Sequence, residues 1–216
     1  AYCAFVNGGK KINPILIDRI QDSEGVTFFS TDTRSCRKCD QISYFSDSIP
    51  KISDNFDQII SPQSAYQITS MLEGVVKRGT GKRLRDLNLD IGGKTGTTNK
   101  NTDTWFIGFT SKLVIGAYVG MDDPEPLGRY ETGAKTAMPI FKDFVKNAIK
   151  KKDARPFKVP SGISMMVIES KTGKKANFGS KETIIEAFKK EKIENDYILF
   201  RNINDRLDEN NILKFY

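Results

Sequence analysis

The pattern of apolar and polar residues along this chain predicts two long helices. Apolar residues recur at helical spacing after Ser61-Pro62, which has the form of an N-cap followed by proline, and Arg78-Gly79-Thr80-Gly81 ends the pattern. These signals predict a helix over residues 62–77. A second helix is predicted to open near Thr136 and to reach about Lys150, with a lysine-rich last turn that suits the negative end of a helix dipole.

Runs of β-branched and aromatic residues separated by short breaks predict antiparallel strands. The first two runs form a hairpin around a polar turn, and the other three follow one another with short connections. The predicted strands cover residues 12–20, 26–29, 89–98, 104–109 and 113–120.

The segments outside these elements are less regular. The apolar opening of the chain runs into the helix stop Asn7-Gly8-Gly9 without a helix start, which suggests truncation, and residues 30–60 predict a long polar excursion at the surface. After a linker over residues 155–162, a hairpin of 163–170 and 176–178 and a short helix near 182–190 are expected. Residues 194–216 receive no functional interpretation.

Composition and charge narrow the class of protein. The 216 residues are 38% hydrophobic and carry a net charge of +7, enough for one globular core with a basic surface. Basic and acidic residues are interleaved along the chain, which disfavours nucleic acid as a partner. The sequence has no run of about eighteen apolar residues that could span a membrane. It has no histidine, which excludes Ser-His-Asp and Cys-His nucleophile systems and sites with histidine metal ligands.

Three cysteines leave a smaller question open. Cys36 and Cys39 form a C-x-x-C pair in a polar stretch, which suits a local disulfide or surface thiols better than a redox motif or half of a zinc site. The redox motif would need a neighbouring βαβ pattern, and the zinc site would need a second pair of ligands. The sequence has neither, so no metal or cofactor is expected.

The candidate chemistry lies in Gly92-Gly93-Lys94-Thr95-Gly96-Thr97-Thr98, between predicted strands. On a strand, Lys94 and Gly96 point to one face and Thr95 and Thr97 to the other. Gly96 would let the backbone of an extended peptide approach, the threonine hydroxyls could bind a terminal carboxylate, and the Thr97 backbone N–H could donate to a developing oxyanion. Lys94 would add positive potential and could help to move a proton.

Two other interpretations of this motif are weaker. Gly93-Lys94-Thr95 matches the end of a phosphate-binding loop, but Asn88 stands where that motif needs a glycine and a strand follows where it needs a helix. A second Lys-Thr-Gly, at residues 171–173, stands where a hairpin needs a turn. The triplet alone is therefore weak evidence, and the residues around it decide between these interpretations.

That neighbourhood resembles the class A, bifunctional, high-molecular-mass penicillin-binding proteins, whose signatures include a Lys-Thr-Gly strand. The similarity covers roughly residues 1–150. The matching segments are residues 1–10, 14–25, 61–76, 78–81, 93–99, 103–109, 118–122 and 133–141.

The resemblance implies an α/β (α+β) fold of the β-lactamase and transpeptidase kind, an antiparallel sheet with packed helices, truncated at its N-terminal side. We expect residues 12–29 and 89–120 to form that sheet, residues 1–152 to be the C-terminal part of the transpeptidase domain, and residues 153–216 to be an appendage of unknown role. Lys94 and the Thr97 N–H would be catalytic, and Thr95, Gly96, Thr97 and Thr98 would bind substrate.

The resemblance also implies a nucleophilic serine in a Ser-x-x-Lys motif and a Ser-x-Asn motif upstream of the Lys-Thr-Gly strand. The formal matches begin at Ser35, Ser48 and Ser53, in a polar loop downstream of the expected position. We therefore expect the nucleophile, the missing half of the domain, the glycosyltransferase half and the membrane anchor to lie outside this chain.

The implied activity is cross-linking of peptidoglycan stem peptides through a serine acyl-enzyme, with β-lactams as inhibitors, at the periplasmic face of the inner membrane. This piece alone would be inactive. The alternative is a non-catalytic module that contacts peptidoglycan or acts as a scaffold.

Overall fold

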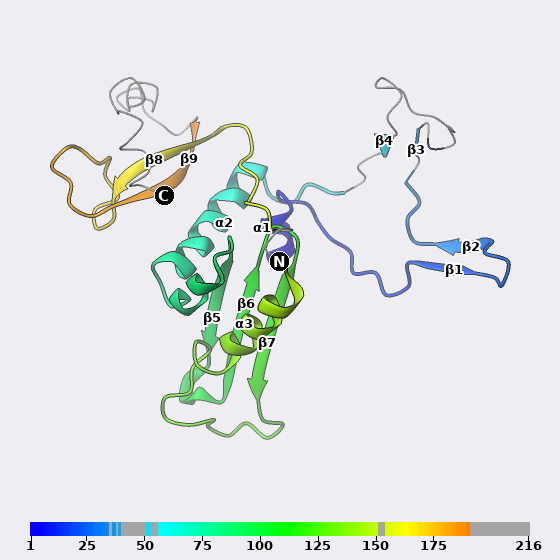
Figure 1. The fold of residues 1–216 in the computed structure, drawn as a ribbon, viewed down its shortest axis with the longest axis horizontal. Helices are drawn as coiled ribbons and strands as arrows, with labels where there is room; N and C mark the ends of the chain where they lie inside the picture. The colour runs from blue at the N-terminus through cyan, green and yellow to red at the C-terminus, as the bar shows by residue number, and fades with distance from the viewer. Residues whose placement is uncertain (35, 38, 40–50, 53–55, 151–153, 191–216) are drawn as a thin grey trace. The chain divides into compact units, whose positions relative to one another are not determined.

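The computed structural model (Figure 1) describes residues 1–34, 36–37, 39, 51–52, 56–150 and 154–190. The chain divides into two compact units. One comprises Ala1–Gly9 with Ile60–Tyr216, and the other comprises Lys10–Ile59. The boundary expected near residue 152 stays a prediction.

The larger unit contains a three-stranded antiparallel sheet in the order β5-β6-β7, made of Gly92–Thr97, Asp103–Phe109 and Val114–Gly120. Gly96 stands opposite Trp105, which in turn stands opposite Tyr118. The predicted strands at 104–109 and 113–120 are thus confirmed within a residue, whereas the predicted strand at 89–98 is shorter.

One face of the sheet is covered by α3 (Ala137–Ala148), which lies over β6 and β7 (Figure 1). The ring of Phe141 meets that of Phe106 at a centroid distance of 4.9 Å, and both side chains are fully buried. Burying such a side chain contributes about 1.5–3 kcal/mol. The predicted second helix is confirmed, and its apolar stripe holds this face of the sheet.

The opposite face, at the Gly92 end of β5, is approached by α1 (Tyr2–Val6) and α2 (Pro62–Lys77). A Cβ on Gly92 would lie 2.4 Å from the Phe109 ring and 3.3 Å from the backbone nitrogen of Glu73 in α2, so glycine permits this close packing. The helix α2 has the bounds predicted from the sequence. Ser61 is its N-cap, and the Ser61 hydroxyl accepts a hydrogen bond from the Ser64 N–H.

Two short 3₁₀ helices connect these elements. Lys82–Leu87 (η1) follows the turn after α2 and buries Leu84 and Leu87 in the core. Asn99–Asn101 (η2) lies in the connection from β5 to β6. These connections keep the chain close to both ends of β5.

The hairpin in the smaller unit differs from the prediction. Strand β1 covers only Arg19–Gln21, and it pairs with β2 (Thr27–Ser30) in a separate two-stranded sheet that does not join β5-β6-β7. The apolar run before Arg19 was expected to be strand. It includes Pro14, which lacks the N–H that a ladder needs, and no strand of the described part of this unit pairs with it.

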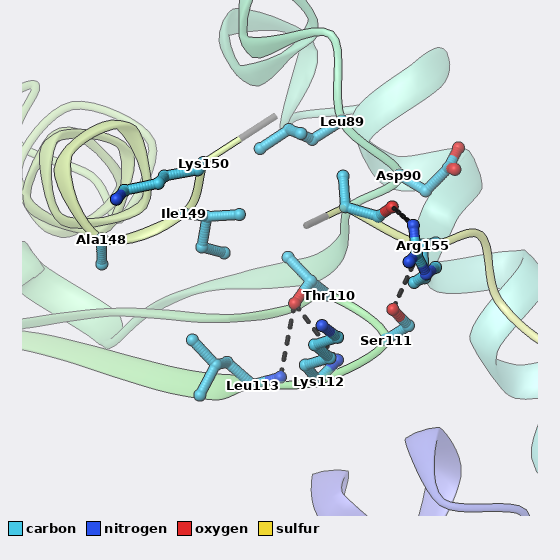
Figure 2. A pocket seen from close by; sticks show the side chains of 11 residues that line it. Leu89, Asp90, Thr110, Ser111, Lys112, Leu113, Ala148, Ile149, Lys150 and Arg155 are labelled. Carbon is cyan, nitrogen blue, oxygen red and sulfur yellow. Dashed lines mark hydrogen bonds between the residues drawn. The ribbon is translucent and has the colours of Figure 1, made fainter. Parts of the chain in front are cut away.

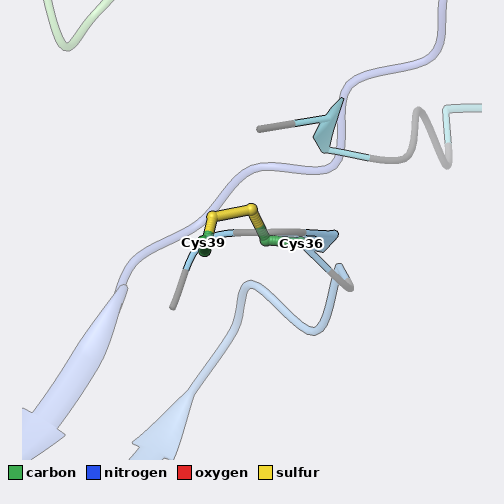
Figure 3. The surroundings of a disulfide bond; sticks show 2 residues. All are labelled: Cys36 and Cys39. Carbon is green, nitrogen blue, oxygen red and sulfur yellow. A yellow bond between two sulfur atoms is a disulfide. The ribbon is translucent and has the colours of Figure 1, made fainter. Parts of the chain in front are cut away.

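The same unit contains the two-residue strands β3 (Cys36–Arg37) and β4 (Lys51–Ile52). Cys36 and Cys39 are joined by a disulfide across a Cα–Cα distance of 5.7 Å (Figure 3). Cys3 in α1 carries a free thiol. The sequence left open whether these two cysteines form a local disulfide or remain surface thiols, and the structure has the disulfide.

The C-terminal hairpin also differs from the prediction. Strand β8 (Ile163–Glu169) pairs with β9 (Thr183–Lys189), so the short helix expected near 182–190 is wrong. The return strand expected at 176–178 is also wrong, because the chain there forms no strand and the pairing with β8 is limited to an isolated bridge between Lys175 and Ile168. The second Lys-Thr-Gly is a turn as predicted, with Gly173 at φ +68° and its N–H bonded to Glu169.

Candidate active site

The candidate site is built on β5, which lies at the edge of its sheet. One side of β5 pairs with β6, and no strand in the described part of the chain pairs with the other side. Gly93 allows the strand to pack tightly at its start, since a Cβ there would lie 2.7 Å from the Phe106 ring and 2.9 Å from the Ile107 carbonyl oxygen. The sequence thus anchors the Gly92 end in the core and leaves the rest of the strand accessible.

The direction of the β5 backbone groups follows from the turn after the strand. The Thr98 N–H donates to the Asp103 carbonyl at 3.0 Å, so the backbone groups of Thr98 face β6. Because successive residues of a strand direct these groups to alternate sides, Lys94 and Gly96 also bond β6, whereas Thr95 and Thr97 face the open edge. Their N–H groups can therefore pair with an added strand.

On one face of this edge, Lys94 and Gly96 lie in line. Lys94 is exposed, and its Nζ donates to the Thr95 carbonyl oxygen at 2.9 Å. Beside Gly96 lies Trp105, whose ring packs against that of Tyr118 at a centroid distance of 4.7 Å. The lysine ammonium is therefore held beside the outward backbone of the strand.

On the other face, the hydroxyls of Thr95 and Thr97 each have one partner from another segment. The Thr95 hydroxyl meets the Thr80 hydroxyl at 3.2 Å. The Thr97 hydroxyl accepts from the Gly133 N–H at 3.1 Å. Each threonine keeps hydrogen-bonding capacity for a further group at the open edge.

Thr98 has a different position. Its hydroxyl lies 2.8 Å from that of Thr102 and accepts from the Asp103 N–H at 2.9 Å. Hydrogen bonds from Tyr118, at 2.7 Å, and then from Thr102 and Thr98 hold the pKa of Asp103 below its ordinary value. The assignment of Thr98 to substrate binding stays a prediction, and in this structure its hydroxyl holds the β5–β6 connection.

Two contributors to the site were missed in the sequence. Thr80 and Gly133 lie 15 and 36 residues from their partners on β5. Neither belongs to the Lys-Thr-Gly motif, although both lie in segments that carry the resemblance. The serines that formally match catalytic motifs, Ser35, Ser48 and Ser53, lie outside the described residues.

A separate cavity of about 240 Å³ lies at the far end of the sheet (Figure 2). It is lined by the β6–β7 turn at 110–113, the end of α3 and Arg155, whose carbonyl oxygen accepts from the Ser111 hydroxyl at 2.9 Å. Neither Lys94 nor the threonines of β5 line this cavity, so it is not part of the candidate site.

Within the residues described, no three His, Cys, Asp or Glu side chains are grouped so as to hold a metal ion. Of the helices that can be described, none has the length and apolar character needed to cross a membrane.

Known proteins are similar to this chain in sequence and fold. The profile of the penicillin binding protein transpeptidase domain matches residues 1–146. Penicillin-binding protein 1A of Rickettsia conorii is 41% identical over all of this chain, which spans 27% of that protein, so the similarity includes residues beyond the profile. Penicillin-binding protein 1A of Pseudomonas aeruginosa is 33% identical, and the similarity covers 88% of this chain and 27% of that protein.

A solved structure agrees with these relatives. The crystal structure of penicillin-binding protein 1A from Haemophilus influenzae has a TM-score of 0.69 and 34% identity, covering 86% of this chain and 30% of that one. The chain thus spans about a quarter of the curated relatives it matches. The open strand with its Lys-Thr-Gly motif, the matching profile and these relatives together show that the chain belongs to the penicillin binding protein transpeptidase domain family.

Proposed function

We propose that this chain supplies the substrate-binding strand of a peptidoglycan D,D-transpeptidase that cross-links stem peptides through a serine acyl-enzyme. The observation that carries the proposal is the open edge of β5, to which Thr95 and Thr97 direct their backbone N–H groups. The nucleophilic serine and its lysine base come from residues outside this chain.

The edge suits the extended end of a D-alanyl-D-alanine stem peptide. A peptide that adds to β5 as a strand gains main-chain hydrogen bonds, and Gly96 presents no side chain to obstruct it. The Thr95 and Thr97 hydroxyls are placed to donate to the terminal carboxylate. Lys94 adds a positive charge on the neighbouring face.

The chemical step follows from these positions. The serine oxygen attacks the carbonyl carbon of the penultimate D-alanine, and the Thr97 N–H donates to the oxyanion that forms. Expulsion of the terminal D-alanine leaves an acyl-enzyme, and the amine of a neighbouring stem peptide then displaces the serine. One oxyanion donor of this kind contributes about a hundredfold to a thousandfold in rate. A β-lactam acylates the same serine.

The same proposal gives location and partners. Stem peptides and β-lactams are the ligands, and the rest of the transpeptidase domain is the partner that completes the site. Peptidoglycan lies outside the bacterial inner membrane, so the site faces the periplasm, with the anchor carried by residues outside this chain.

A fluorescent penicillin tests the proposal. The 216-residue chain alone should form no covalent adduct, whereas the longer protein that supplies the Ser-x-x-Lys segment should be labelled at that serine. A labelled band mapped to any serine of this chain would show that the motif assignment is wrong. No labelling of the longer protein would favour a non-catalytic module.

Variants of the strand test the role of β5. In the longer protein, Gly96→Val should nearly abolish acylation, because its side chain occupies the path of the substrate backbone. Lys94→Ala should slow acylation about tenfold or more, since it removes a charge-assisted contact. Lys171→Ala, in the second Lys-Thr-Gly, is the matched control and should be silent. Equal effects at Lys94 and Lys171 would contradict the placement of the site.

A further inference from the structure

We propose that Thr80, fixed in turn by the β8–β9 hairpin, orients the Thr95 hydroxyl as a donor to the anionic group of the substrate. This inference rests on the proposed function. It assigns a positioning role to two segments outside the Lys-Thr-Gly strand, one of which lies beyond residues 1–146 that the family profile matches.

A threonine hydroxyl has a single proton to donate. Thr97 has its acceptor capacity engaged by the Gly133 N–H, which can only donate, so the Thr97 proton remains for another acceptor. The Thr95 hydroxyl likewise has one partner, which is the Thr80 hydroxyl at 3.2 Å. When Thr80 donates to Thr95, the Thr95 proton is directed to the open edge, and both threonines then present protons to one anion.

The position of Thr80 is set by the turn that ends α2. The N–H groups of Gly79 and Gly81 both donate to the Val75 carbonyl oxygen, at 3.0 and 2.9 Å. A Cβ on Gly79 would lie 2.9 Å from that oxygen, so the turn packs against the helix end as closely as a backbone can. Thr80 lies between these two glycines, and the turn directs it to Thr95.

The first residue of this turn is bound by the C-terminal hairpin. Arg78 donates from Nη2 to Glu186 of β9, and its guanidinium lies across Gly74, where a Cβ would be only 2.7 Å away. The Glu186 side chain is 16% exposed and the Arg78 side chain 40%, so the ion pair is partly shielded from water on its carboxylate side. Glycine at position 74 gives the arginine its path to the hairpin.

Two further hydrogen bonds hold the hairpin on α2. Gln67 donates from Nε2 to the Ala187 carbonyl oxygen at 3.0 Å, next to Glu186 on β9. Gln63 donates to the Ser161 carbonyl oxygen at 2.9 Å, just before β8. The hairpin therefore contacts α2 along one side, and its ion pair reaches the turn that carries Thr80.

The test compares a penicillin with its methyl ester, because only the free acid offers a carboxylate to Thr95. In the longer protein, Thr80→Ala should lower the acylation rate constant for the acid about tenfold, as expected for misdirecting one hydrogen bond to a charged group. The rate with the ester should change by less than about twofold, because the ester offers no carboxylate to the Thr95 hydroxyl. Thr80→Ser keeps the hydroxyl and should restore most of the preference for the acid.

The hairpin is tested by a matched pair of substitutions. Glu186→Gln should lower the acid-over-ester preference about threefold, which corresponds to part of one such hydrogen bond. Glu182→Gln makes the same change of charge on the same hairpin, but Glu182 pairs with Lys171 in an exposed contact at 3.3 Å and should leave the preference unchanged.

Each outcome separates the inference from the proposed function. If the unchanged protein reacts with penicillin and Thr80→Ala keeps the full preference, the role of Thr80 is refuted while the proposed function stands. Equal losses with acid and ester would also refute it, since they would indicate general structural support. Identical results for the two glutamate variants would refute the role of the hairpin, and an unreactive protein would overturn both proposals.

Discussion

Replacing Gly133 by alanine tests whether the loop before α3 must touch the backbone of the site strand. A Cβ at this position would lie 2.3 Å from the Trp105 carbonyl oxygen and 2.6 Å from that of Gly96. Both neighbours are backbone atoms within the sheet, so they cannot turn aside as a flexible side chain would. The loop has to move instead.

The size of the effect follows from these distances. Restoring an ordinary contact needs a shift of about 1 Å, which stretches the bond from the Gly133 N–H to Thr97 beyond hydrogen-bonding range. Overpacking of this kind costs about 1–3 kcal/mol, and the lost hydrogen bond about 1 kcal/mol more. For a domain of this size the sum lowers the melting temperature by roughly 5–15 °C.

Thermal unfolding of the chain, followed by circular dichroism, measures this change. Gly116→Ala in β7 is the control, because nothing lies within 4 Å of the Cβ that it adds. The control should lose no stability and should gain about 0.5 kcal/mol, because alanine is more stable than glycine in a strand. Melting of Gly133→Ala within a degree or so of the unchanged chain would refute the close packing of loop and strand.

Two further predictions concern the cysteines and the Asp103 carboxylate. Titration of the denatured, unreduced chain with a thiol reagent should find one thiol, that of Cys3, and reduction should raise the count to three by opening the Cys36–Cys39 bond; three thiols before reduction would contradict the pairing. The lowered pKa of Asp103 stabilises the fold above its ordinary value of 3.8, and this contribution is lost as the pH falls through the lower folded value. Tyr118→Phe removes the largest cause, so carboxyl titration by NMR should show a higher pKa for Asp103, and an unchanged value would exclude the hydrogen bond.

The sequence predicted best where several local signals agree. The bounds of α2 were predicted correctly because Ser61-Pro62 and the glycine-rich turn mark both ends, and an apolar stripe continues between them. The β6 and β7 strands were predicted because β-branched and aromatic residues dominate both. In each of these segments, local preference and tertiary packing favour the same structure.

The C-terminal strand shows where local pattern fails. Apolar residues at 184, 185, 187 and 188, with the charged Glu186 between them, fit one face of a helix as well as they fit a strand. Pairing with β8 decides, since Ile184 and Ile185 stand opposite Ile168 and Val167, and β-branched residues pack well across such a ladder. The partner strand lies too far along the chain for the pattern of a single segment to include it.

The site could be predicted only in part for a related reason. The Lys-Thr-Gly strand is contiguous, so its alternation of faces follows from the sequence. Thr80 and Gly133 contribute through one hydroxyl and one backbone N–H, and ordinary turn and loop residues can supply both. Only the fold brings them to Thr95 and Thr97.

The open edge of β5 also has a consequence for solubility. Backbone groups that can receive a peptide can equally receive the same strand of a second molecule, which is how exposed edges lead sheets to aggregate. Lys94 stands on this edge and is exposed. Two copies paired there would bring two such charges together, so the lysine that serves the proposed substrate also opposes self-association, and its removal would cost the protein solubility as well as reactivity.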